Sequence, residues 1–114
     1  MMDTIFTKII NREIEANIIY EDNNLLAFED INPQAPIHIL IIPKKEIKTI
    51  NDVEDSDKVL LGEMFLAVKK IAKKLTIDKK GYRLIVNCNG DGGQTVFHLH
   101  MHLLGGRKLT WPPG

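Results

Sequence analysis

The segment that most constrains the fold runs from Phe97 to Leu104, FHLHMHLL, where three histidines alternate with apolar residues. Successive side chains of an extended strand point to opposite faces of a sheet. The alternation therefore places His98, His100 and His102 on one face and the apolar residues on the other, inward face. A helix would instead scatter the imidazoles around its surface. The pattern predicts a strand that carries three imidazoles side by side.

Three interpretations of these histidines are open. Chance placement on a solvated face is one, although charged neighbours would repel each other and buried neutral rings would need hydrogen-bond partners. A zinc or iron site is the second, because alternating histidines can converge on a metal. The flanking residues Val96, Phe97, Leu103 and Leu104 supply no further ligand, so any others would have to come from distant parts of the sequence. Catalysis by imidazole is the third.

The loop before the histidines, residues 87–95, holds three glycines in four residues, Gly90, Gly92 and Gly93. Glycine permits positive φ and close approach of the backbone, so that amide N–H groups can turn together toward an anion. Taken alone, such a loop is more often an ordinary hairpin connection. Its position directly before the histidines makes it a candidate phosphate cradle.

These residues resemble the histidine triad superfamily of nucleotide hydrolases and transferases. Residues 98–104 match its pattern of three histidines, each followed by an apolar residue, with a second apolar residue at the end. The resemblance covers essentially the whole chain and is to the histidine triad nucleotide-binding protein branch. The tail separates that branch from the diadenosine-polyphosphate hydrolases. Beyond the triad, the matching segments are DINPQAPIH at 30–38, IPKK at 42–45, DGGQ at 91–94 and WPPG at 111–114.

The resemblance implies a role for each histidine. A neutral imidazole is nucleophilic at pH 7, whereas a serine hydroxyl must first lose its proton. His100, the central member, is expected to attack phosphorus, with its other ring nitrogen held by a backbone carbonyl. His102 is expected to meet the leaving group and its proton, while His98 and His38 orient the site and support charge.

The resemblance also implies a nucleotide site, in which Asp30 binds the ribose and Phe28 and Ile31 contact the base. From the residues alone, Asp30 is equally well a turn residue, and His38 could be a buried histidine satisfied by backbone. The residues expected to contact the nucleotide are Phe28, Asp30, Ile31, Asn87, Gly93, Gln94, Thr95, His100, His102 and Trp111.

The remaining pattern predicts an α+β fold, with a five-stranded antiparallel sheet and two helices. By resemblance, the sheet continues across a homodimer, and Trp111 lies near the partner's site. A short helix is expected to begin at Asp3 or Thr4 and to end near Asn11. The other expected elements are strands at 18–21, 25–29, 37–43 and 82–87 and a long helix from about 56 to 75.

Length and composition fit one histidine triad domain over residues 1–114. Fifteen basic residues balance fifteen acidic ones, which argues against nucleic acid or an anionic membrane as a partner. No leader or membrane segment is recognisable, and a cytoplasmic protein is expected. Cys88 is the only cysteine, so no internal disulfide forms. Thr4 and Thr7 stand where some relatives carry a cysteine pair that helps bind zinc.

The resulting hypothesis is a purine nucleoside phosphoramidase. Its substrate would be AMP or GMP linked through a P–N bond, cleaved through a nucleotidyl-histidine intermediate on His100 without metal or cofactor. Two alternatives stay open. One is a nucleotide-binding or scaffolding protein with incidental hydrolysis, and the other is a metal-dependent hydrolase.

Overall fold

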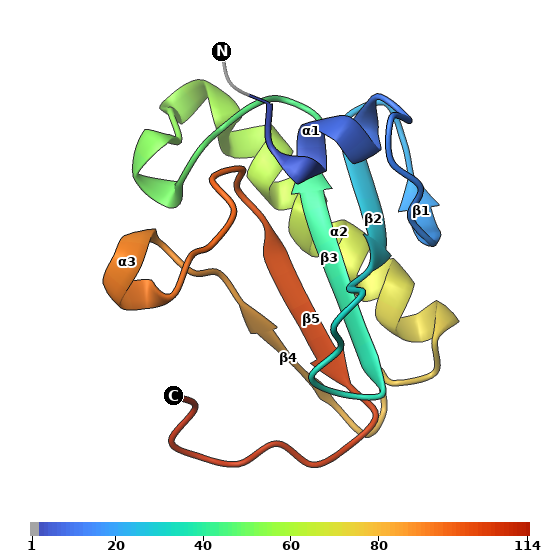
Figure 1. The fold of residues 1–114 in the computed structure, drawn as a ribbon. Coiled ribbons are helices and arrows are strands. Elements are labelled where there is room, and N and C mark those ends of the chain that lie inside the picture. The colour runs from blue at the N-terminus through green and yellow to red at the C-terminus, as the bar shows by residue number, and fades with distance from the viewer. Residues whose placement is uncertain (1–2) are drawn as a thin grey trace.

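A computed structural model describes residues 3–114 and contains one antiparallel sheet of five strands in the order β1-β2-β3-β5-β4 (Figure 1). The predicted α+β class and the five strands are confirmed. Each connection between β1, β2 and β3 joins neighbouring antiparallel strands, as in a meander, and β5 enters between β3 and β4. The strands are β1 (Ile18–Glu21), β2 (Leu25–Glu29), β3 (Ile37–Pro43), β4 (Tyr82–Ile85) and β5 (Met101–Gly105).

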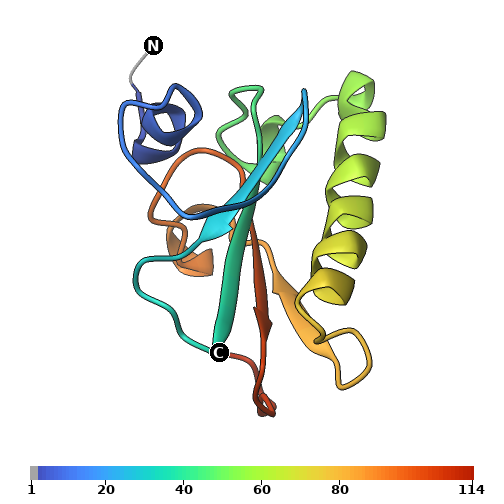
Figure 2. The same cartoon turned by 90° about the vertical axis from the view of Figure 1, so that its right-hand side faces the viewer.

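Two helices cover the two faces of this sheet, α1 (Ile5–Ile10) on one side and α2 (Lys58–Lys74) on the other (Figure 2). Thr4 caps α1, because its hydroxyl accepts from the N–H of Thr7 while the Thr7 hydroxyl accepts from the N–H of Thr4. The two threonines are thus bonded to each other. Two 3-10 turns, Ile50–Asp52 and Asp55–Asp57, lead into α2.

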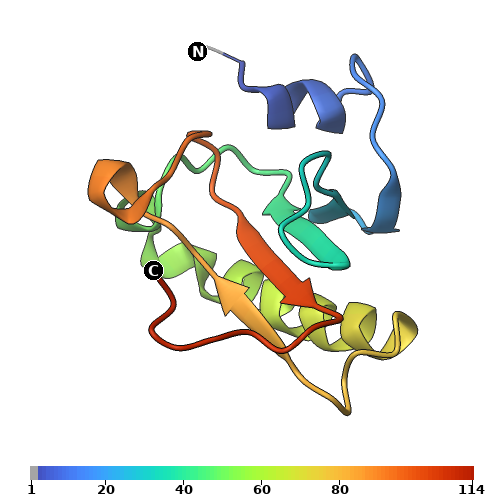
Figure 3. The same cartoon turned by 60° about the horizontal axis from the view of Figure 1, so that its bottom comes forward.

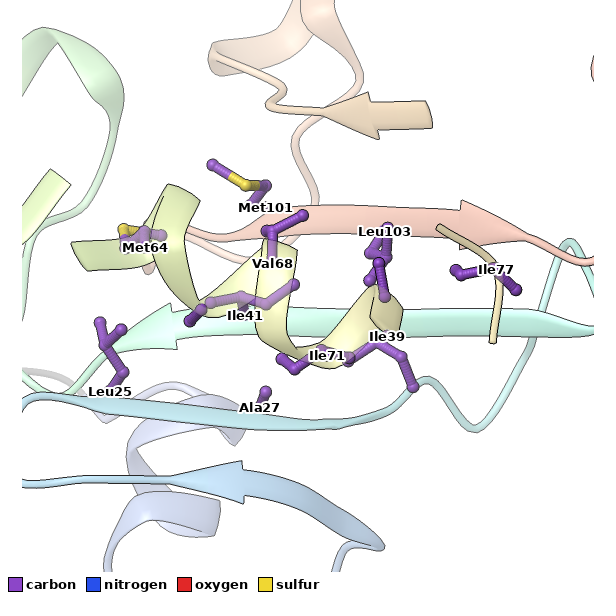
Figure 4. Packing of buried hydrophobic residues seen from close by; sticks show 12 residues of the cluster. Leu25, Ala27, Ile39, Ile41, Met64, Val68, Ile71, Ile77, Met101 and Leu103 are labelled. Carbon is purple, nitrogen blue, oxygen red and sulfur yellow. The ribbon is translucent and has the colours of Figure 1, made fainter. Parts of the chain in front are cut away.

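The face under α2 holds the larger hydrophobic core (Figure 4). Period-two alternation in the strands and helical spacing in α2 bring the apolar side chains of the two layers together. Burying this face is the main favourable term for the fold. The residues of the cluster include Leu25, Ala27, Ile39, Ile41, Met64, Val68, Ile71, Met101 and Leu103.

The opposite face packs on α1 and forms a second, smaller cluster of Phe6, Ile9, Leu26, Phe28, Leu40 and Ile42. Because both faces of β2 and β3 are covered, these strands read as continuous apolar runs rather than as alternating ones. The histidines share the face that α1 covers, so they are not on a solvated surface.

The expected strand of histidines is shorter than the alternation suggested, because β5 begins only at Met101. The ladder with β3 ends at the Ile41 and Met101 pair, close to Pro43, which has no N–H to donate. The preceding residues bond elsewhere: the Leu99 N–H donates to the Ile47 carbonyl. The alternation of faces still persists through His98 and His100, both of which are buried.

The glycine loop, which the sequence predicts to be a hairpin connection or a phosphate cradle, contains a short helix, α3 (Asn89–Gly92). Gly93 ends it in the left-handed region with φ 83°, a conformation that glycine adopts without steric cost. In Figure 3 the C-terminal tail runs back beside β4, where Arg83 donates to the Thr110 carbonyl at 3.0 Å. Within residues 3–114, no helix combines the length and apolar character needed to cross a membrane.

The core account predicts that Ile71→Ala destabilises the fold by about 2–5 kcal/mol, because it removes buried methyl groups between α2 and the sheet. Ile71 is 1% exposed. The free energy of unfolding from urea titrations measures this loss. Lys69→Ala, on the exposed side of the same helix, should change it by less than about 0.5 kcal/mol. Equal losses in both variants would contradict the packing described.

Candidate active site

His98 and His100 lie beneath Phe6 of α1. The Phe6 ring meets the His100 ring edge to face, with centroids 5.0 Å apart, and the His98 ring at 6.2 Å. Both histidines are nearly inaccessible, at 1% and 6% exposure. An aromatic wall of this kind excludes water and leaves the imidazoles in a low-dielectric environment.

His100 is held in one tautomer by its own backbone. Its Nδ1 lies 2.7 Å from the carbonyl oxygen of His98, and a carbonyl only accepts, so Nδ1 carries the proton. In a neutral ring, Nε2 must then hold a lone pair. His100 therefore presents a nucleophilic nitrogen without any prior deprotonation.

His38 and His102 form a second hydrogen-bonded chain. The backbone N–H of Gln34 donates to Nδ1 of His38 at 3.0 Å, so neutral His38 carries its proton on Nε2. That nitrogen lies 2.9 Å from Nδ1 of His102, which must accept. His102 in turn carries its proton on Nε2. The ring centroids of His100 and His102 are 5.0 Å apart. The ring with a lone pair on Nε2 is therefore next to the ring with a proton on Nε2.

His98 ties the segment that carries the histidines to strand β3. Its Nε2 lies 2.7 Å from the Pro43 carbonyl oxygen, to which it donates. Pro43 is the last residue of β3, so this bond ties the segment before β5 to the neighbouring strand where the ladder has ended. The same backbone carries the carbonyl that orients His100.

Burial lowers the pKa of all four histidines. For His38, His98 and His100, desolvation of the charged form is the main cause. For His102, desolvation acts together with repulsion from the His100 and His38 rings, and its pKa falls to about 4. The imidazoles are consequently neutral at pH 7, as the tautomer assignments require.

Asp30 lies at the edge of this cluster. One carboxylate oxygen accepts from the Asn32 N–H at 2.8 Å, as in an Asx turn, and the other lies 3.5 Å from Nε2 of His38. The carboxylate therefore favours a proton on that nitrogen. Asp30 acts as a turn residue and still has lone pairs that can accept from a ligand.

Asp30, His38 and His102 also resemble a metal site, because one ligand atom from each lies within 4.8 Å of the others. The tautomer of His38 disfavours metal binding. A metal on Nε2 of neutral His38 would move the ring proton to Nδ1, directly against the Gln34 N–H that donates there. Coordination would therefore require breaking this bond or rotating the ring.

A pocket of about 270 Å³ opens between α1 and the sheet beside His100. Five of the residues expected to bind or react with a nucleotide line it, namely Phe28, Asp30, Ile31, Thr95 and His100. Phe28 is buried at its base, whereas Ile31 is 92% exposed at its rim. The pocket is thus apolar at depth and has a carboxylate and a nucleophile on its walls.

Sequence reasoning missed the part of this pocket that the N-terminal segment builds. Its pattern predicted a short helix, yet nothing local shows that this helix would face the histidines. The contact depends on the path of the whole chain. The additional lining residues include Ile5, Phe6, Ile9, Ile14, Ala16, Leu40 and Val96.

Gln94 is bonded to the loop itself. Its side chain accepts from the Asn89 N–H and donates to the carbonyls of Lys48 and Val96. The N–H groups of Gly93 and Gln94 donate to Gly90 and Asn89. Gln94 therefore shapes the loop that presents Thr95 to the pocket.

Asn87 and Trp111 are not among the residues that line this pocket. Asn87 follows β4 and is half-buried. Trp111 is 80% exposed in the tail, with the Arg83 guanidinium 6.0 Å from its ring centroid. Five of the ten expected nucleotide contacts therefore line the pocket. Of the other five, His102 lies in the histidine cluster, Trp111 lies in the tail, and Asn87, Gly93 and Gln94 lie in the loop before the histidines.

A family model described as the HIT domain, for histidine triad, matches residues 11–109 of this sequence. The chain belongs to the HIT family. A HIT-like protein of Synechocystis sp. is 53% identical over 112 residues, which are 98% of this chain and 97% of that protein. Another, from Buchnera aphidicola, is 54% identical over 110 residues, which are 96% and 98% of the two chains.

Solved HIT structures share the fold. A HIT family hydrolase from Legionella pneumophila is 54% identical, with a TM-score of 0.96 over 98% of this chain and 100% of that one. A histidine triad nucleotide-binding protein from Candida albicans is 32% identical, with a TM-score of 0.83 over 96% and 83%. The chain is therefore a HIT protein similar to hydrolases and to a nucleotide-binding protein of that family.

The lowered pKa of His102 in this HIT protein predicts acid-sensitive stability. The unfolded chain binds a proton near pH 6.5, whereas the folded site resists protonation until about pH 4. The free energy of unfolding should therefore fall as pH drops from 6.5 to 4, by up to about 3 kcal/mol from this group.

Urea titrations of wild type and His102→Gln across this range measure that contribution. Carboxylates and the other three histidines titrate in both proteins, so the difference between the two curves reports His102 together with its repulsion of His100 and His38. The wild-type curve should be the steeper one. Parallel curves would show that His102 titrates normally in the folded protein.

Proposed function

We propose that this HIT protein is a purine nucleoside phosphoramidase that hydrolyses the P–N bond of nucleoside 5′-phosphoramidates through a nucleotidyl-His100 intermediate. The observation that carries the proposal is the free lone pair on Nε2 of His100, on the wall of an apolar pocket. A neutral, oriented imidazole in a site that excludes water suits attack on phosphorus.

The pocket suits a purine nucleoside. A base would lie between α1 and the sheet, on Phe28 and the isoleucines, and Ile31 at the rim would cover it. Asp30 retains carboxylate lone pairs for the ribose hydroxyls. The α-phosphate would then lie between Thr95 and His100, within reach of the reacting nitrogen.

In the first step, Nε2 of His100 forms a bond to phosphorus as the P–N bond breaks, and the departing nitrogen takes one proton. His102 delivers that proton from Nε2. An anionic phosphate beside the His38 and His102 pair raises the pKa of the pair, so one extra proton enters with the substrate. When Nε2 of His102 gives up its proton, Nδ1 of His102 keeps the proton shared with His38, and both rings end neutral. His98 and Asp30 hold the geometry and support the charge.

The second step reverses the proton flow. Water attacks phosphorus, His102 accepts a proton from it through Nε2, and the bond from phosphorus to His100 breaks. The products are a nucleoside monophosphate, an amine and unmodified protein. The proton consumed in the first step is returned in the second, so no metal or redox partner is needed for balance.

We further propose that the active form is a homodimer. β4 is an edge strand, and its exposed backbone can pair with a second copy. Trp111 is a large apolar side chain left 80% exposed in the tail, which is costly unless another surface covers it. Placement of that tail near the partner's pocket would explain why Trp111 lies apart from the site in one chain.

Two other functions remain as alternatives. A nucleotide-binding or scaffolding protein would bind AMP but release product at a negligible rate. A metal-dependent hydrolase would lose activity on chelation, whereas the Gln34 N–H on His38 disfavours coordination there. Turnover measured with and without EDTA separates both alternatives from the proposal.

The proposal predicts that wild type mixed with a slowly cleaved AMP phosphoramidate, in EDTA, gains the mass of one nucleotidyl group. His100→Ala should show no adduct and should lose at least about 1,000-fold in kcat, because the nucleophile is gone. Lys69→Ala, far from the pocket on α2, is the control and should retain turnover.

Peptide fragmentation then shows whether the adduct is on His98, His100 or His102. An adduct on His98 or His102 would overturn the assignment of the nucleophile. Full turnover by His100→Ala would overturn the covalent mechanism altogether.

A further inference from the structure

Arg107 lies just beyond β5, outside the pocket and the histidine cluster. Its guanidinium donates twice to the carbonyl oxygen of Gln34, from Nε at 3.3 Å and from Nη2 at 3.0 Å. A third bond runs from Nη1 to the carbonyl of Lys108 at 3.3 Å. Gln34 belongs to the exposed loop between β2 and β3, and Arg107 ties that loop to the end of β5.

The chain is built to place Arg107 there. Ile37 pairs with Gly105 at the last rung between β3 and β5, and Gly106 then turns with φ 90°. A Cβ on Gly106 would lie 2.9 Å from the Cβ of Pro36, so only glycine lets the two segments approach this closely. The contact brings the next residue, Arg107, over Gln34.

Gln34 is also the residue that fixes the tautomer of His38. Its N–H donates to Nδ1 of His38 at 3.0 Å, and His38 in turn bonds His102 at 2.9 Å. The carbonyl of the same residue receives both bonds from Arg107. Hydrogen bonds therefore link Arg107 to Gln34, Gln34 to His38 and His38 to His102, the ring proposed to protonate the leaving group. The link passes through the backbone of Gln34, from its carbonyl to its N–H.

We propose that Arg107 is a positioning residue, which holds Gln34 so that its N–H keeps His38 and His102 in the tautomers that place a proton on Nε2 of His102. The kinetic consequence rests on the proposed phosphoramidase function. The effect on the tautomers does not, because it follows from the hydrogen bonds alone.

The Gln34 backbone has two hydrogen-bond partners among the described residues: its N–H donates to His38, and its carbonyl accepts from Arg107. The loop is exposed from Ile31 to Gln34, and its internal bonds join Asp30 to Asn32 and the Gln34 side chain to the Asn32 carbonyl. These bonds shape the turn without attaching Gln34 to the sheet. Ala35, the next residue, is buried, and Arg107 holds the carbonyl of Gln34 from the exposed side, so its loss should let the Gln34 N–H drift from His38.

A free His38 can carry its proton on Nδ1 and accept on Nε2 instead. His102 would then donate from Nδ1 and present a lone pair on Nε2, where the leaving amine needs a proton. Cleavage of an alkylamine should therefore suffer. A leaving group that departs as a stable anion, such as p-nitrophenolate, needs no proton and should be spared.

The first experiment compares Arg107→Met, Arg107→Lys and the neighbouring control Lys108→Met on two substrates, an AMP alkylphosphoramidate and AMP p-nitrophenyl ester. Arg107→Met should lower kcat for the phosphoramidate about fivefold to tenfold, and for the ester less than about twofold. Arg107→Lys, which keeps one donor, should recover part of the loss. Lys108→Met should match wild type.

Equal losses on both substrates would show that Arg107 has only a structural role, and unchanged kinetics would show that it has none. Either result overturns the proposal. The ester is the decisive arm, because a general loss of folding or of nucleotide binding lowers both rates together.

The second experiment reads the tautomers directly from long-range 1H–15N NMR spectra of the imidazoles at pH 7. Arg107→Met should shift His38 and His102 toward the Nδ1–H form, while His100, bonded to the His98 carbonyl, stays unchanged as an internal standard. Unaltered His38 and His102 signals would overturn the proposal. If wild type cleaves neither substrate, the proposed function fails, and these spectra still decide the role of Arg107.

Discussion

The hydrogen bond from Nδ1 of His100 to the carbonyl of His98 is the interaction on which the site depends. It assigns the ring proton to one nitrogen and leaves the other with a lone pair at neutral pH. The carbonyl can serve this purpose because the backbone between the two histidines has left the β ladder. It is held instead by the Leu99 N–H, which donates to the Ile47 carbonyl, and by the His98 side chain, which donates to the Pro43 carbonyl. The late start of β5, at Met101, is therefore part of the chemistry.

The two faces of the sheet have different roles. Packing on α2 supplies most of the stability, while the face under α1 places four imidazoles where water is scarce. Burial there has a cost, since it opposes protonation of every ring. The same burial keeps His100 neutral and nucleophilic, and it makes the proton balance of the site depend on backbone groups such as the Gln34 N–H.

Periodicity predicted most of the fold, because the strands at 18–21, 25–29 and 37–43 are bounded by turns and carry clear apolar runs. The start of β5 was placed too early, because alternation continues past the point where its partner can bond. In the site, the alternation singled out His98, His100 and His102, whereas His38 and Asp30 were assigned by the resemblance. A backbone carbonyl on His100 was implied by the resemblance, and it is the carbonyl of His98. The tautomers of His38, His98 and His102 could not be predicted, because they depend on the N–H of Gln34 and the carbonyl of Pro43, and nearly every residue type has the same main-chain groups. The role of α1 in the pocket was hidden for a similar reason, since it arises only when the chain is folded.

Neutron diffraction from a deuterated crystal at neutral pD tests the central claim most directly, because it locates the proton on each imidazole. The structure predicts deuterium on Nδ1 of His100 and none on its Nε2. Deuterium on Nε2, or on both nitrogens, would contradict the account, since the ring would then have no lone pair to offer phosphorus.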